Sequence, residues 1–181
     1  IGFTLISSVF APNFGGEYKK DQGDVILSGS YDAHELANVS GYAIMLENNS
    51  DTYGINSQGN TNVSGYDVGY YAEFAVQGDN TLGDTDVVND STYLNIEANA
   101  DVKGVSLALG YEVFGQDDDA TKGFAAPYSS THGKNGNIDV FAAQIAAGTL
   151  TAGLTDISFS AGYDVENIGS FSAVFHSFSA A

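Results

Sequence analysis

The sequence has no cysteine, no arginine and no tryptophan, and only two prolines and one methionine among its 181 residues. Without cysteine, the chain can form no disulfide, no thiolate nucleophile and no Cys-bound zinc site. No apolar run reaches the length of about 18 residues that a transmembrane helix requires, and no signal peptide is visible. The few prolines leave the long segments between turns free to pair as strands.

Positive charge is also scarce. Five lysines face 23 acidic residues, so the formal net charge is −18. Such a chain cannot replace the counterions of nucleic acid, which excludes nucleic-acid binding as a function. The same charge disfavours docking on anionic lipid surfaces and favours cations or basic partners.

What the chain has in abundance are glycines and aromatic residues, with 22 Gly, 11 Tyr and 11 Phe. Residues 64–113 alternate between apolar and small, polar or acidic positions over long runs, and a period of two is typical of β-strands with one apolar face. The clearest run places five apolar residues on one face: Val105, Leu107, Leu109, Tyr111 and Val113. Carboxylates on the opposite face suit a barrel in lipid, where the outward face is the dry one.

We therefore expect a single domain over residues 1–181, an all-β, antiparallel up-and-down β-barrel of membrane type with about ten strands. The alternative is a soluble β-sandwich or jelly roll. Residues 141–147 are rich in alanine and leave a local helix open as an alternative to strand. The expected strands cover residues 2–12, 24–32, 38–47, 52–58, 64–77, 91–102, 105–114, 137–147, 149–165 and 170–178.

The connections between these strands differ in length. Residues 34–35, 59–62 and 103–104 are expected to be short turns, whereas residues 78–90 and 115–136 form long loops. Short turns on one side and longer loops on the other are typical of outer-membrane barrels.

Specific sequence runs resemble the C-terminal part of the barrel of alginate-export-like outer-membrane porins. The most specific run begins with a "GYEV" strand and continues into a loop with a Phe-x-x-Pro element. Weaker matches cover most of the chain, down to a strand like the family's "VYHDFSAD". The matching segments are Leu109–Gly115, Lys122–Phe124 with Pro127, Thr131–Gly133 with Gly136, Asp139–Phe141 and Val174–Ala180.

The resemblance implies a membrane barrel in a bacterial outer membrane. Thr131 and Asn137 stand where the family run carries Leu and Trp, and the chain ends where the family continues through further strands. We therefore expect an altered form, or a fragment of a larger barrel. We do not expect the family's anionic substrate. A lumen that passes an anionic polysaccharide needs positively charged side chains, and this chain has no arginine.

Several acidic side chains fall on the polar faces of the expected strands, where they would line a lumen and favour cations. These lumen and selectivity residues are Asp67, Glu73, Glu97, Glu112, Asp156 and Asp164.

Acidic loops offer oxygen ligands for Ca²⁺, although solvated carboxylates explain the same composition. The candidate ligands are Asp84, Asp86, Asp117, Asp118 and Asp119. Otherwise no cofactor is expected. No motif of a nucleophile, a metalloprotease or a phosphate loop is present, so we expect no catalytic residue and no enzyme.

Two functions follow as hypotheses. The first is a porin-like channel in the bacterial outer membrane, which contacts the lipid bilayer and lets small polar or cationic solutes diffuse passively. Residues 115–136 would fold inward as a constriction. The second is an extracellular, self-assembling structural β-protein, whose copies join by strand addition and bind Ca²⁺ in their acidic loops. A homo-oligomer is compatible with both.

Overall fold

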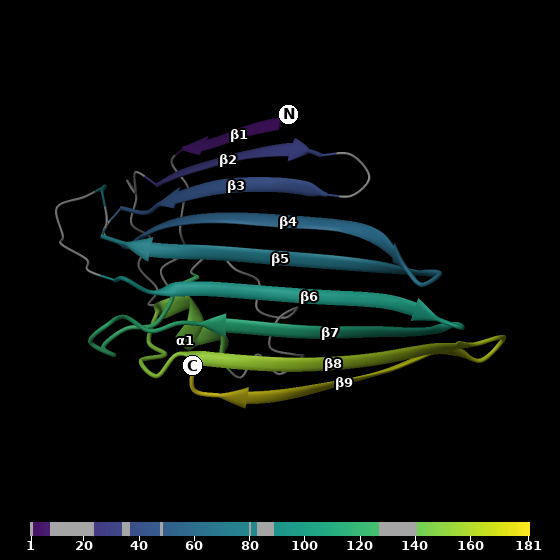
Figure 1. Cartoon of the computed structure of the whole chain (residues 1–181). Coiled ribbons are helices and arrows are strands. Elements are labelled where there is room, and N and C mark those ends of the chain that lie inside the picture. The colour runs from purple at the N-terminus through teal and green to yellow at the C-terminus, as the bar shows by residue number, and fades with distance from the viewer. Residues whose placement is uncertain are drawn as a thin grey trace.

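The computed structural model describes residues 2–7, 24–33, 37–47, 49–79, 81–82, 89–126 and 141–181, with the backbone alone for residues 3 and 5–7. These residues form one antiparallel sheet of nine strands, whose spatial order is the order of the chain (Figure 1). The expected all-β, antiparallel, up-and-down architecture is confirmed. The elements are β1 (Gly2–Ser7), β2 (Val25–Asp32), β3 (Asn38–Met45), β4 (Asp51–Val63), β5 (Tyr66–Gly78), β6 (Thr92–Val102), β7 (Val105–Phe114), α1 (Ala142–Ala147), β8 (Leu154–Val165) and β9 (Gly169–Ser179).

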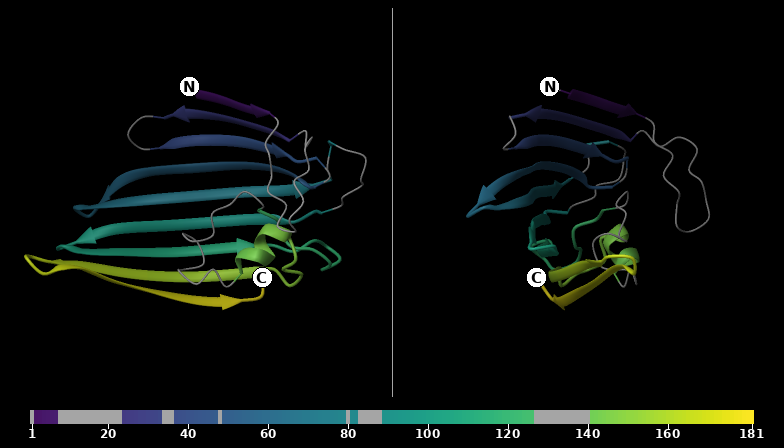
Figure 2. Two further views of the ribbon diagram at one scale, coloured as in Figure 1. Left: turned by 180° about the vertical axis from the view of Figure 1, so that it is seen from behind. Right: turned by 90° about the vertical axis from the view of Figure 1, so that its right-hand side faces the viewer.

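The sheet is curved but not closed. Within the described residues β1 and β9 each have one neighbouring strand, so they form the two edges. Figure 2 shows the curvature and places α1 on the concave side. We call the side that faces α1 the concave face and the opposite side the convex face.

Two hairpins have two-residue turns in which both residues adopt positive φ, namely Ser64-Gly65 and Lys103-Gly104. This turn geometry matches the twist of the flanking strands. In both, a side chain two residues before the turn accepts the glycine N–H: Asn62 Oδ1 at 3.0 Å and Asp101 Oδ1 at 2.9 Å. The expected turn at residues 103–104 is confirmed.

The expected turn at residues 59–62 is wrong. β4 continues to Val63, and Gly59 and Asn60 pair with Tyr70 and Gly69 of β5. Glycine and asparagine favour turns only where positive φ is needed, and here the ladder keeps both residues extended.

The expected strand over residues 137–147 is also wrong, because residues 142–147 form α1, the helix that the alanine content had left open. α1 ends at Gly148, which has φ of 63° and closes the helix in the left-handed conformation. Residues 137–140 lie outside the described part. β8 begins at Leu154 rather than at residue 149, since residues 149–153 form a turn.

Other boundaries shift less. β3 ends at Met45 rather than at residue 47, and β1 is described only to Ser7, so residues 8–12 of the expected first strand lie outside the described part. The short connection expected at residues 34–35 also lies outside it.

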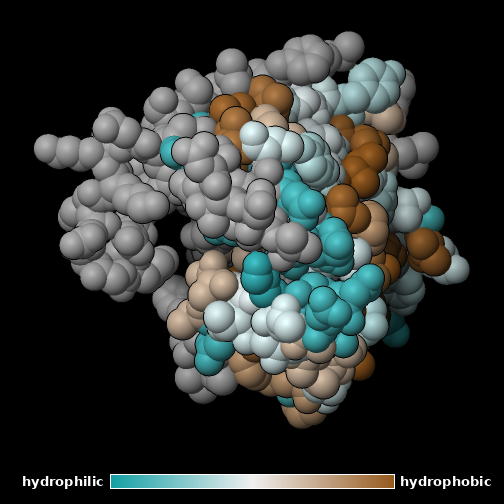
Figure 3. All heavy atoms as spheres, turned by 90° about the vertical axis from the view of Figure 1, so that its left-hand side faces the viewer, coloured by the Kyte–Doolittle hydropathy of each residue, from teal (hydrophilic) through white to brown (hydrophobic). Residues whose placement is uncertain are grey.

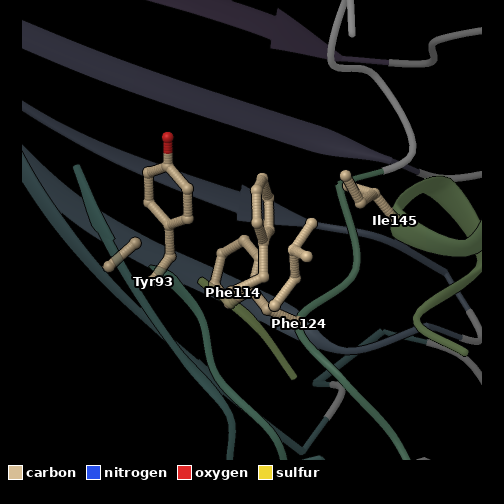
Figure 4. Packing of buried hydrophobic residues seen from close by; sticks show 6 residues of the cluster. Tyr93, Phe114, Phe124 and Ile145 are labelled. Carbon is tan, nitrogen blue, oxygen red and sulfur yellow. The ribbon is translucent and has the colours of Figure 1, made fainter. Parts of the chain in front are cut away.

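A small hydrophobic core forms between the concave face and the segments that cover it (Figure 4). Tyr93 of β6 and Phe114 of β7 pack with Phe124 of the following loop, with ring centroids 5.0 to 6.4 Å apart. Ala75 of β5, Ile145 of α1 and Leu154 of β8 complete the buried cluster. This core lies at the end of the sheet opposite the two-residue turns.

Candidate functional site

All six acidic residues expected to line a lumen lie on the concave face. The strand register aligns Glu73, Asn95, Glu112 and Asp156 in one continuous row across β5 to β8, which we call the carboxylate row. Glu97 lies two residues farther along β6. The structure does not bring Asp67 and Asp164 into this row, because both lie near the ends of hairpins, where Asp67 accepts a hydrogen bond of 3.0 Å from Asn62.

Glu73 is held by two tyrosines. The hydroxyl of Tyr42 donates to Oε1 at 2.6 Å, and the hydroxyl of Tyr71 donates to Oε2 at 2.5 Å. Tyr42 belongs to β3 and must cross β4 to reach Glu73 on β5. Gly54 of β4 makes this crossing possible, because a Cβ at position 54 would collide with the Tyr42 ring.

The remaining members of the row are also bonded. The buried Glu112 accepts from the hydroxyl of Tyr93 at 2.6 Å, and Asn95 donates to Glu97 at 2.8 Å. Glu112 stands directly opposite Asp156 on the neighbouring strand, so these two carboxylates are neighbours on the concave face. Tyrosine and amide donors therefore stabilise a band of negative groups on the concave face.

Asp156 pairs with a histidine that the sequence alone did not single out. Nδ1 of His176 lies 2.8 Å from Asp156 Oδ2, and the imidazole stacks on Phe178 with ring centroids 5.6 Å apart. Asp156 is 3% exposed, and its Oδ1 has no hydrogen-bond partner in the described part of the chain. The only available signal was the spacing of polar positions on β8 and β9, which becomes a contact only once their register is known.

At the end of the sheet that holds α1, this helix and the loop after β7 cover the concave face. The side-chain amide of Gln77 donates to the carbonyl of Ala125 at 2.6 Å, and its oxygen accepts the Ala125 N–H at 2.8 Å. Thr52, Asn89 and Ser91 bond to the same amide. This network fixes the described part of the loop after β7 on the concave face, beside the carboxylate row.

The convex face has the opposite character. All but three of the exposed large apolar side chains lie on it; the exceptions are Ile168, Val174 and Phe178. In Figure 3, which looks along the strands from the end that holds α1, apolar residues gather along the convex side. The convex residues include Leu27, Tyr31, Tyr53, Ile55, Phe74, Ile96, Leu109, Tyr111, Ile157, Phe159, Tyr163, Phe171 and Phe175.

The expected Ca²⁺ ligands are only partly described. Asp117 turns into its own loop, where it accepts from the N–H and hydroxyl of Thr121 at 2.7 Å each and from the Lys122 N–H at 3.0 Å. The Lys122 N–H and the Thr121 hydroxyl hold the pKa of Asp117 below its usual value. Asp118 and Asp119 are exposed. Asp84 and Asp86 lie outside the described part.

Among the residues that the structure describes, no group of three His, Cys, Asp or Glu side chains is arranged to hold a metal ion. Within the same residues, none of the helices is long and apolar enough to cross a membrane.

Comparison with protein-family models, curated proteins and solved structures finds no match for this chain. The resemblance to alginate-export-like porins therefore stays a prediction.

Proposed function

We propose that this sheet is the wall, or part of the wall, of a bacterial outer-membrane β-barrel that lets small polar solutes diffuse, with a preference for cations. The convex face carries this proposal. Soluble proteins rarely expose apolar patches of more than a few hundred Å². Here exposed large apolar side chains are spread over the convex face from β2 to β9. A surface of that kind suits lipid.

Strand length supports the same placement. β4 to β9 contain 10 to 13 residues each. A strand tilted across a bilayer needs about 9 to 11 residues. The two-residue turns lie together at one end of the sheet, and the longer connections that follow β5 and β7 lie at the other, as in outer-membrane barrels (Figure 1).

The acidic residues of the concave face support the preference for cations. Glu97 and Asp164 are exposed on the concave face, where their charges would act on passing ions, while Glu73 and Glu112 are held in place by tyrosines. Acidic groups along a passage favour cations over anions. The loop after β7, fixed by Gln77, would narrow the passage.

Closure of the barrel has a geometric requirement. Because the nine described strands alternate in direction, β1 and β9 run the same way, and direct pairing between them would be parallel. An antiparallel closure needs an odd number of further strands. The proposal therefore includes a larger barrel, of which the described sheet forms part.

Conductance tests the channel. The folded protein in a planar bilayer under a KCl gradient should show a reversal potential of the sign for cations. Replacing both Glu97→Gln and Asp164→Asn should reduce that potential, whereas Gln58→Ala, which removes an exposed neutral side chain from the same face, should not. Folded protein without conductance would reject the channel, and anion preference would reject the selectivity alone.

The second candidate, an extracellular self-assembling β-protein, is favoured by one observation. The edge strand β9 is exposed on nearly all positions of both faces and carries no proline and no Asp, Glu, Lys or Arg. Long, uncharged edge strands readily pair with another chain. In this proposal, Ca²⁺ in the acidic loops joins subunits.

Detergent separates the two candidates. A membrane barrel should aggregate when detergent is removed, whereas an assembly subunit should stay in solution as defined oligomers. If Ca²⁺ joins subunits, EDTA should shift those oligomers to smaller species in size-exclusion chromatography, and added Ca²⁺ should restore them. Soluble oligomers whose size does not change with EDTA would reject the role of Ca²⁺ but not the assembly.

A further inference from the structure

The concave face contains a polar pocket outside the carboxylate row. It has a volume of about 400 Å³ and lies between the ends of β2 and β3 and the parts of β4 to β6 that are nearer the two-residue turns. This volume is within the usual range for small-molecule sites, about 300 to 1,000 Å³. Its polar lining consists of Asp32, Asn38, Gln58, Asn60 and Asn99.

A glycine shapes this pocket. Gly69 of β5 lies between Asn60 of β4 and Asn99 of β6 in the strand register. A Cβ at position 69 would come within 2.7 Å of Asn99 Oδ1, 2.9 Å of Asn99 Nδ2 and 3.1 Å of Asn60 Oδ1. The missing side chain thus lets two amides from flanking strands converge above β5.

The chemistry of the lining restricts the ligand. Gln58, Asn60 and Asn99 form no side-chain hydrogen bond in the described part of the chain, so their donors and acceptors face the pocket or solvent. Each amide offers both a donor and an acceptor, as a sugar hydroxyl does. Asp32 is the one charged residue in the lining, which disfavours anions, and few apolar groups are available to hold an apolar ligand.

We propose that this pocket binds a neutral polyhydroxylated molecule of saccharide size. The site lies on the same face as the proposed passage, but binding there requires only that the sheet is folded. Binding measured on protein in detergent is therefore independent of whether the chain conducts ions. Folded protein that binds the ligand but does not conduct ions would reject only the channel. Folded protein that conducts ions but does not bind the ligand would reject only this site.

Ligand-observed NMR with glucose and maltose tests the site, and glucuronate serves as the charged counterpart of glucose. We expect saturable binding of the neutral sugars and binding of glucuronate that is weaker by about tenfold or more, because its carboxylate meets Asp32. No saturable binding of either neutral sugar by folded protein would overturn the proposal, and so would equal binding of glucuronate.

Variants locate the binding. The double variant Asn60→Ala with Asn99→Ala should weaken binding by about tenfold or more, since it removes two amides. Asn56→Ala is the matched control, because Asn56 lies on the same strand and face as Asn60 but outside the pocket. Equal binding by the double variant and this control would place the sugar elsewhere and overturn the proposal.

Gly69→Ala provides a test that removes no polar group. Its Cβ should push the ends of Asn60 and Asn99 apart and weaken sugar binding while the fold persists, because the groups that must move are flexible side-chain ends. Gly41→Ala is its control, since the nearest atom to a Cβ there is a backbone oxygen at 3.8 Å. Unchanged binding in the Gly69 variant would show that convergence of the amides is not needed and would overturn the proposed geometry.

Discussion

The two faces of the sheet use aromatic residues in opposite ways. On the concave face, Tyr93, Phe114 and Phe124 pack into a buried cluster, and tyrosine hydroxyls hold carboxylates. On the convex face, Phe159 and Phe175 stand opposite each other on neighbouring strands and remain exposed, with Phe175 64% accessible. The same alternating sequence therefore produces one face whose aromatic side chains pack or form hydrogen bonds within the protein. It also produces an opposite face whose exposed aromatic side chains need an apolar partner. The experiments below test this difference and the stability of the loop that covers the concave face.

The largest expected effect is on the concave side. Phe124→Ala should lower the free energy of unfolding in detergent by about 3 to 5 kcal/mol, because it leaves a cavity under the loop after β7. Phe175→Ala, on the convex face, should cost distinctly less, since no enclosed space is created. Urea denaturation followed by circular dichroism measures both. Equal losses would contradict the distinction between a packed and an unpacked face.

The second largest effect is expected for a charged residue placed on the convex face. Leu109, near the middle of β7, is 61% exposed, so lysine would be tolerated there in a soluble protein. In a bilayer, Leu109→Lys should lower the free energy of unfolding by about 2 to 4 kcal/mol. Asn99→Lys, on the opposite face of the adjacent strand, is the control and should cost less than about 1 kcal/mol. Unfolding from liposomes gives both values, and a harmless Leu109→Lys would argue for the soluble assembly.

A smaller effect is expected at the amide that fixes the loop. Gln77→Ala should cost about 1 to 3 kcal/mol, because the Ala125 N–H and the Asn89 amide lose their buried partner. Gln58→Ala removes an exposed amide from the same face and should change the free energy of unfolding by less than about 0.5 kcal/mol. If the two variants were equally stable, the loop after β7 would not depend on this clamp.

The smallest effect concerns pH. Since the pKa of Asp117 is lower in the folded loop than in the unfolded chain, its bonds to Thr121 and Lys122 stabilise the loop above a pH of about 4. That contribution should disappear as the pH falls through the folded pKa. Asp117→Asn should remove the pH dependence of the NMR signals of Thr121 and Lys122. If the Thr121 and Lys122 signals changed with pH in the variant as they do in the unsubstituted protein, another group would be responsible for the pH dependence.

The hairpin of β6 and β7 shows what sequence patterns predict well. Its alternation is long, its turn contains a residue type that accepts positive φ, and the expected bounds of β7 agree with the structure. The six lumen residues were placed on one face for the same reason, because parity along a strand determines the side on which a residue lies. That they line a lumen stays a prediction.

The errors arose where distant parts of the chain decide local structure. Gly59 and Asn60 read as a turn, yet pairing with β5 keeps them extended, and the turn forms at Ser64-Gly65. The contacts of His176 with Asp156, and of Gln77 with Ala125, join residues 20 and 48 positions apart. No local pattern encodes such contacts, because they depend on strand register and on the path of a loop.

The environment of the convex face is the central claim, and the absence of tryptophan allows a direct measurement. Single reporters Leu109→Trp and Phe159→Trp on the convex face, and Ala108→Trp on the concave face, can be introduced into a chain that has no other tryptophan. In liposomes of brominated lipid, we predict strong quenching of fluorescence at positions 109 and 159 and little at position 108. Equal quenching at all three positions, or none at any, would contradict a lipid-facing convex surface.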